Sequence, residues 1–169
     1  MKIIITGHTA GLGLALYNYF NQQGHQVKGY SRSTGHTLPD AFEEIITAAK
    51  NSDLFVNNVY AGNIQSRFIE QLYQNVSIIS IGSMAADFPQ LNTEYQKLKL
   101  LVEQTHTKFN RLTDKSLLLI KSGYLENYPN NYPIQYQEIV DAVDYWIKHP
   151  RVSQITLDND FKFYNQQSR

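Results

Sequence analysis

The chain has 169 residues, of which 42% are hydrophobic and 18% charged, and its 15 basic residues balance its 15 acidic ones. This composition is typical of one soluble globular domain and argues against a disordered chain. Without a basic excess or a basic block, neither a nucleic-acid-binding face nor a polybasic membrane patch is expected. The absence of cysteine excludes disulfides, thiolate chemistry and cysteine metal sites.

The first eleven residues, MKIIITGHTAG, contain one lysine and a short apolar run that stops at Thr6. Such a run is too short for the core of a signal peptide and far too short to cross a bilayer. We therefore expect a cytoplasmic protein without a membrane partner.

Short apolar runs alternate with longer amphipathic ones from the start of the chain. The β-branched run KIIIT at 2–6 predicts a buried parallel strand. The segment Leu12–Phe20 places its apolar side chains on one helical face, and Gly24 is suited to end that helix. A second strand is predicted at 26–30.

The segment after this strand contains turn residues and then a helix, for which Asp40 is the expected N-cap. Only a few positions near Thr37 remain for a strand in between. Further strands are predicted at 53–57, 76–82, 116–121 and 152–158, and further helices at 65–74, 93–109 and 136–149. This alternation predicts an α/β protein with a doubly wound parallel sheet and helices on both faces, a Rossmann fold. We expect one domain over 1–158 and a tail at 159–169.

The segment TGHTAGLG follows the first strand and opens directly into a helix. Gly7 permits a tight turn, Gly11 lets the backbone approach a pyrophosphate, and Gly13 lets the helix pack on the strand. The N–H groups at the start of the helix then face the phosphates. A tight turn without a ligand is the alternative. We expect a dinucleotide site formed by Gly7, Thr9, Ala10, Gly11, Leu12 and Gly13.

The residues after the second strand should contact the adenosine ribose and so distinguish NAD(H) from NADP(H). An NAD site usually has an Asp or Glu there, but the segment Ser31-Arg32-Ser33 contains no acid and none follows before Asp40. A guanidinium flanked by two hydroxyls suits a 2′-phosphate, which it can hold with two parallel hydrogen bonds. The sequence therefore favours NADP(H) over NAD(H), unless Arg32 is simply a solvated surface charge.

Five segments, in this order, resemble motifs of the short-chain dehydrogenase/reductase family. They are TGHTAGLG, NNVYAG (57–62), IGSMAAD, YQKLK and IKSGYLEN (120–127), and together they span the chain from Met1 to about Asp158. NNVYAG is similar to the Asn-Asn-Ala-Gly motif of the family with two residues inserted. The resemblance implies that Asn57 and Asn58 belong to the cofactor site and that Ser83, Tyr95 and Lys99 are catalytic.

The spacing of Tyr95 and Lys99 places both on one face of a helix. A neighbouring ammonium favours the phenolate form of a tyrosine, whose reference pKa is about 10, and so brings it closer to the range of a general acid. Ser83, at the end of a strand, is placed to hydrogen-bond a substrate carbonyl. The resemblance further implies that Lys99 hydrogen-bonds the nicotinamide ribose of the cofactor.

The Tyr-x-x-x-Lys pattern has little weight alone. With twelve tyrosines and ten lysines in the chain, about 0.7 occurrences are expected by chance. Its position on the helix that follows the strand ending at Ser83 gives it meaning. A stabilising surface pair is the alternative to catalysis.

The chain is shorter than usual members of the family, and the losses affect the substrate side. The segment between Gly62 and Val76 has room for only one short helix, where the family has a long one that carries a catalytic asparagine. Neither Asn63 nor Asn75 has the family's spacing to the serine. The leading hypothesis is an NADP(H)-dependent oxidoreductase that acts on a small carbonyl or alcohol substrate. The alternative is a dinucleotide-binding regulatory or scaffolding module.

The remaining candidates are weaker. The five histidines show no metal-ligand spacing, so no metal site is expected. Tyr60, Tyr124 and Tyr128 lie in loops at strand ends and either line a substrate mouth or pack in an ordinary way. A homo-oligomer formed through the helix at 95–109 is a possibility that the family resemblance raises.

Overall fold

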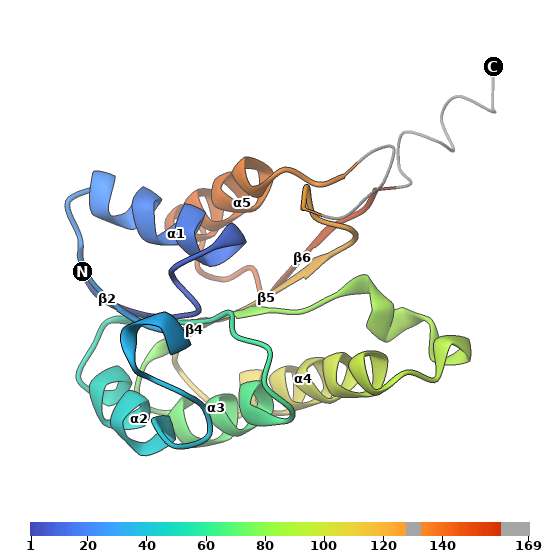
Figure 1. The fold of residues 1–169 in the computed structure, drawn as a ribbon, viewed down its shortest axis with the longest axis horizontal. Helices are drawn as coiled ribbons and strands as arrows, with labels where there is room; N and C mark the ends of the chain where they lie inside the picture. The colour runs from blue at the N-terminus through green and yellow to red at the C-terminus, as the bar shows by residue number, and fades with distance from the viewer. Residues whose placement is uncertain (128–132, 160–169) are drawn as a thin grey trace.

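The fold places one parallel sheet between two layers of helices (Figure 1), as seen in a computed structural model that describes residues 1–127 and 133–159. Tyr128 and the predicted tail from residue 160 onward lie outside the described residues. The six strands are β1 (Lys2–Thr6), β2 (Gln26–Tyr30), β3 (Leu54–Asn57), β4 (Ser77–Ile81), β5 (Leu117–Ser122) and β6 (Gln154–Leu157). The predicted Rossmann arrangement is confirmed.

The strands lie in the order β2-β1-β3-β4-β5-β6, and every neighbouring pair is parallel. In the usual Rossmann order, 3-2-1-4-5-6, a third strand extends the sheet beyond the second. Here that strand is absent from the described chain, so β2 is the edge strand. The chain reverses its direction of travel across the sheet between β1 and β3. This switch point is where sheets of this kind bind ligands, outside the carboxyl ends of the strands.

Alternating side chains of each strand pack against opposite helical layers. Ile3 and Ile5 contribute to the core beneath α1 (Gly11–Gln22) and α5 (Tyr136–Lys148), whereas Ile4 contributes to the core on the other face. That second face is covered by α2 (Phe42–Lys50), α3 (Ile64–Leu72) and α4 (Glu94–Asn110) (Figure 1). The buried β-branched strands explain why the sheet is parallel and central.

The connection from β2 to α2 differs from the prediction. It contains a short 3₁₀ helix, η1 (Arg32–Thr34), and no strand near Thr37. Asp40 does not cap α2, which begins one residue later than expected, after an N-cap at Ala41 that makes no side-chain bond. Ala41 and Phe42 are both buried in the core, so their packing, and not a polar cap, determines where the helix starts.

Phe68 anchors the face formed by α2, α3 and α4. It is fully buried, its ring stacks on Phe42 at a centroid distance of 4.8 Å, and it meets Phe55 edge-on at 5.1 Å. We expect Phe68→Ala to lower the free energy of unfolding by about 3–5 kcal/mol, because it removes buried apolar contacts and leaves a cavity. Urea unfolding followed by circular dichroism measures this change. Leu112→Ala, at a position that is 58% exposed, is the matched control and should change stability by less than about 0.5 kcal/mol.

Candidate functional site

The loops that leave β1, β3 and β4 meet at the carboxyl edge of the sheet, on both sides of the switch point. The first of these, the glycine loop (residues 7–10), is closely packed. Gly7 has a positive φ of 72°, and a Cβ on Gly13 would lie 1.9 Å from the Gly7 carbonyl oxygen. A side chain at position 13 would therefore push α1 away from the loop.

Asn58 holds the glycine loop from the neighbouring strand end. Its Nδ2 donates to the Thr6 carbonyl at 3.1 Å, and a Cβ on Gly7 would lie 2.9 Å from the same nitrogen. The Thr6 hydroxyl accepts from the backbone N–H groups of Asn58 and Val59 at 3.1 and 3.2 Å. These bonds fix the loops after β1 and β3 relative to each other.

The start of α1 has the chemistry of an anion site. Its N-cap, Ala10, provides no side-chain acceptor for the first N–H groups of the helix, and Gly11 has a φ of 53°. Helix N-termini with uncapped N–H groups and glycine at the approach favour phosphate. Leu12 is buried, so it can contribute to such a site only through its backbone. The glycine loop therefore fits the pyrophosphate of a dinucleotide.

A cluster of hydroxyl groups connects the glycine loop to the turn after β2. The Thr9 hydroxyl lies 3.3 Å from the Ser31 hydroxyl and accepts from the Ser33 hydroxyl at 2.9 Å. Ser31 also closes a capping box with Thr34. The structure thus brings the predicted residues Thr9, Ser31 and Ser33 together, and Arg32 is exposed beside them.

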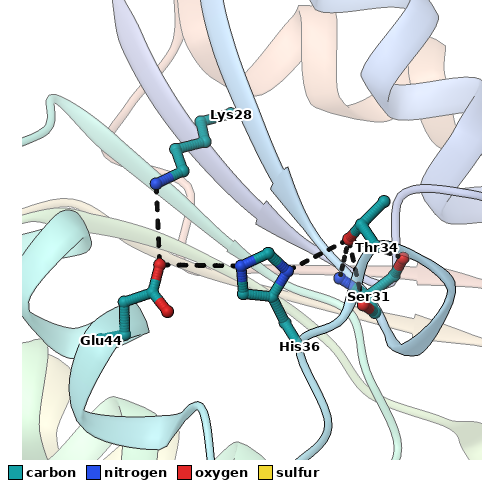
Figure 2. A network of polar contacts seen from close by, with 5 residues as sticks. All are labelled: Lys28, Ser31, Thr34, His36 and Glu44. Atoms are coloured by element: carbon teal, nitrogen blue, oxygen red, sulfur yellow. Dashed lines mark hydrogen bonds and ion pairs between the residues drawn. The ribbon is translucent and has the colours of Figure 1, made fainter.

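Figure 2 shows one acidic side chain near the turn after β2, that of Glu44 on α2, and it contacts Lys28 and His36. Glu44 Oε1 lies 3.8 Å from Lys28 Nζ and 3.7 Å from His36 Nε2, and His36 Nδ1 lies 3.2 Å from the Thr34 hydroxyl. This network ties the turn after β2 to α2. No carboxylate of residues 31–39 is available for a ribose diol, because that segment contains none.

Asn57 faces the interior and not the open edge. Its side chain is fully buried, and Nδ2 donates to the Gln65 carbonyl at 2.8 Å and to the Ser80 hydroxyl at 3.4 Å. Its own carbonyl accepts from Gln65 Nε2 at 2.9 Å. Asn57 therefore links the end of β3 to the first turn of α3 and shapes the loop at the edge of the site.

Lys99 is a buried cation at the carboxyl end of β4. It is 4% exposed, and Nζ donates to Gln65 Oε1 at 2.8 Å and to the Ile81 carbonyl at 2.9 Å. None of the ion pairs found among the described residues includes it. Burial without a carboxylate disfavours the charged form and lowers the pKa of Lys99 from 10.5 to about 8.

Two tyrosine rings lie beside this lysine. Lys99 Nζ is 5.7 Å from the ring centroid of Tyr95 and 5.8 Å from that of Tyr60, and the two rings meet edge-on at 5.2 Å. Tyr95 and Tyr60 are 41% and 48% exposed, so a small molecule can reach both. The structure therefore brings Tyr95 and Lys99 together as the spacing predicts, with the cation behind the ring and the ring open to solvent.

Ser83 follows β4 as the N-cap of a 3₁₀ helix, η2 (Met84–Asp87), and its Oγ accepts from the Ala85 N–H at 3.2 Å. This segment packs against α4. It is anchored by Lys121, whose Nζ lies 2.5 Å from Asp87 and 2.9 Å from Glu103 on α4. Although burial by itself lowers the pKa of Lys121, the bonds to these carboxylates outweigh it and raise the pKa.

Sequence analysis missed Gln65, which contacts Lys99 directly. One signal could have revealed it, because positions 65, 68, 69 and 72 form the buried stripe of α3. A polar residue in that stripe indicates a buried partner. Asp87, Glu103 and Lys121 were also missed, and their pairing depends on a contact between β5, η2 and α4 that no local pattern predicts.

No group of three His, Cys, Asp or Glu side chains in ranges 1–127 and 133–159 could hold a metal ion. Within the same ranges, no helix is long and apolar enough to cross a membrane.

No family model matches the chain, and no curated protein matches it. Many solved structures do resemble it. A bulky-bulky ketone specific alcohol dehydrogenase from Comamonas testosteroni has a TM-score of 0.72 at 15% identity, over 99% of this chain and 91% of that one. A short-chain dehydrogenase from Sphingobium yanoikuyae in complex with NADPH has a TM-score of 0.71 at 12% identity, over 99% and 91%.

A 3-alpha-hydroxysteroid dehydrogenase from Pseudomonas sp. B-0831, complexed with NADH, has a TM-score of 0.67 at 16% identity, over 100% of both chains. At these identities the likeness lies in the fold. The chain therefore has the Rossmann fold seen in short-chain dehydrogenases.

The depressed pKa of Lys99 should make stability depend on pH. Unfolding returns the group from about 8 to its ordinary 10.5, so the unfolded chain binds more protons between these values and stability rises with pH across that window. The full effect is about 3 kcal/mol. We expect Lys99→Met to remove this rise, measured as the wild-type-minus-variant difference in unfolding free energy from pH 7.5 to 10.5. Lys97→Met, at an exposed position of the same helix, should leave the rise unchanged.

Proposed function

We propose that the chain is a short-chain dehydrogenase/reductase that transfers hydride between NADP(H) and a small carbonyl or alcohol, with Tyr95 as the general acid and base. The observation that carries this proposal is the buried ammonium of Lys99 held next to the exposed ring of Tyr95. A buried lysine with a lowered pKa at the ligand-binding edge of a Rossmann sheet supports a functional site there.

The proposed cofactor site lies at the carboxyl edge of the sheet. The glycine loop and the first N–H groups of α1 would hold the pyrophosphate, and Arg32 with Ser31 and Ser33 would hold a 2′-phosphate. Lys99 would hydrogen-bond the nicotinamide ribose. When bound, the cofactor supplies or accepts the hydride, and the protein supplies orientation and a proton. Structures similar to this chain were solved with NADH and with NADPH, so the preference for NADP(H) rests on Arg32 and on the missing acid.

Tyr95 has the exposure and the electrostatic setting for proton transfer. During reduction its hydroxyl gives a proton to the carbonyl oxygen of the substrate, and during oxidation the phenolate takes the proton back. The Lys99 ammonium favours that phenolate. With a pKa of about 8, Lys99 is mostly protonated near neutral pH, so the favourable charge is present.

Ser83 and Tyr60 complete the substrate side of the proposal. The Ser83 hydroxyl accepts one bond from the Ala85 N–H, which leaves its proton free to be donated to a substrate carbonyl. Tyr60 offers an exposed aromatic surface edge-on to Tyr95. Together they would orient a small carbonyl against the Tyr95 hydroxyl.

Replacing Tyr95 by Phe tests the proposed acid. The change removes one oxygen from an exposed ring, so we expect NADPH affinity within about twofold of wild type and kcat lowered by at least about 100-fold. Turnover is followed by NADPH absorbance with a panel of aldehydes and ketones. Tyr145→Phe, on the outer face of α5, is the matched control and should retain full activity.

The outcomes separate the two functional classes. Persistent turnover in Tyr95→Phe would show that another group donates the proton. Tight NADPH binding by the wild-type chain without turnover on the whole panel would contradict the enzyme and favour the dinucleotide-binding module.

Arg32→Ala tests the cofactor preference independently of turnover. Loss of a charge-assisted contact to a 2′-phosphate should weaken NADPH binding by about 10- to 100-fold and leave NADH binding unchanged. Fluorescence titration with both nucleotides measures this difference, and Arg151→Ala, at an exposed turn before β6, is the control. Equal losses for both nucleotides, or tighter binding of NADH by wild type, would contradict the assignment of Arg32.

A further inference from the structure

Gln65 is a long polar side chain on the buried face of α3, which is mostly apolar. It is 1% exposed, and its neighbours along the buried stripe are Phe68, Ile69 and Leu72. Burying an amide is costly unless both of its polar atoms are bonded. Hydrogen bonds must therefore offset the free-energy cost of removing the Gln65 amide from water.

Every polar atom of this amide has a partner at the carboxyl edge. Nε2 donates to the Asn57 carbonyl at 2.9 Å and to the Ile81 carbonyl at 3.1 Å. Oε1 accepts from Lys99 Nζ at 2.8 Å. Because Nε2 is fixed by two strand-end carbonyls, Oε1 has one direction in which to point, and Lys99 lies in that direction.

The Lys99 ammonium has three N–H donors. Gln65 Oε1 and the Ile81 carbonyl accept from two of these donors. The third N–H group remains for a bound ligand. The Ile81 carbonyl and Gln65 Oε1 hold Nζ from two sides, and Gln65 supplies the one side-chain acceptor of this pair.

We propose that Gln65 is a positioning residue for the proposed reaction: its amide oxygen, held by the ends of β3 and β4, fixes the Lys99 ammonium behind Tyr95. This inference rests on the proposed function. Gln65 itself is too deeply buried to touch a substrate. It acts through Lys99.

A neutral acceptor also sets the charge balance of the site. Among residues 1–127 and 133–159, the titratable side chains placed against Lys99 are Tyr95 on its own helix and Tyr60 on the loop after β3. Glu103, one turn further along α4, is engaged by Lys121. An amide at position 65 thus holds the ammonium without adding a negative charge that would strengthen its protonation.

Two substitutions of Gln65 should act on Lys99 in opposite directions. Gln65→Met keeps the length and removes the acceptor, so kcat should fall by about 10- to 100-fold, the alkaline limb of the kcat–pH profile should move to lower pH, and NADPH affinity should change less than about threefold. Gln65→Glu keeps an oxygen for Lys99, so it should restore most of kcat relative to Met and move the alkaline limb to higher pH. A merely structural role would lower stability without these opposed shifts.

A second measurement does not need turnover. The pH dependence of the unfolding free energy between pH 7.5 and 10.5 reports the protonation of Lys99, and Gln65→Glu should flatten its rise because the carboxylate raises the pKa of the lysine. In a Lys99→Met background, Gln65→Glu should produce no further change above about pH 9, where even a buried carboxylate is ionised. This arm distinguishes the two proposals, because it holds even if no substrate is turned over.

The control is Gln71→Met, at an exposed position of the same helix, which should match wild type in every readout. The role of Gln65 would be overturned by unchanged alkaline limbs together with a Gln65→Glu effect on stability above about pH 9 that persists in Lys99→Met. A Gln65→Met variant that retains kcat within twofold would overturn it as well. If Gln65→Met does not fold, the Gln65→Glu and Lys99→Met comparison decides the question.

Discussion

A buried ammonium without a carboxylate must be compensated by dipoles, and this requirement organises the carboxyl edge of the sheet. Lys99 finds its compensation in the Ile81 carbonyl and the Gln65 amide. Gln65 in turn bonds the ends of two central strands, and one of these bonds goes to Asn57. One charge therefore connects β3, β4, α3 and α4 at the point where the tyrosine ring opens to solvent. Removing the Gln65 or the Lys99 side chain would leave the other as a buried polar group without that partner. The desolvation cost of such a group exceeds the net stabilisation that the hydrogen bond provides.

The same edge shows how a shortened Rossmann sheet retains the loops that would bind the proposed cofactor. The segment between β2 and α2 is too short for a third strand and forms η1 instead, with its hydroxyls bonded to Thr9 of the glycine loop. β2 is consequently an edge strand, and Lys28 at its centre opposes pairing with another sheet edge. The missing third strand thus affects the periphery of the sheet. The switch point between β1 and β3, where the dinucleotide would bind, is intact.

Local patterns predicted the features that depend on neighbouring residues in the sequence. The apolar runs located the six strands, and the spacing of Tyr95 and Lys99 placed the two on one helical face. The Asp40 cap was wrong because the core contacts of Ala41 and Phe42, which are tertiary, decide where α2 starts. Gln65 was missed for a related reason: its partners are 8 to 34 residues away along the chain, and only the assembled sheet brings them together. Side-chain orientation was equally hidden, since an asparagine beside a ligand and one turned inward, as Asn57 is, look the same in a motif.

Two lysines at this edge are equally exposed, and yet their pKa values are shifted in opposite directions. Lys99 and Lys121 are each 4% exposed. Lys121 is paired with Asp87 and Glu103, which raises its pKa and fixes its charge, so it serves to anchor the segment after Ser83 onto α4. Lys99 has only neutral acceptors, and its pKa falls to about 8. If burial alone had determined these environments, both lysines would have acquired carboxylates, because an unpaired buried cation is destabilising. A fold that pairs one lysine with carboxylates and gives the other only neutral acceptors keeps that second charge available, and the group beside it is the exposed ring of Tyr95.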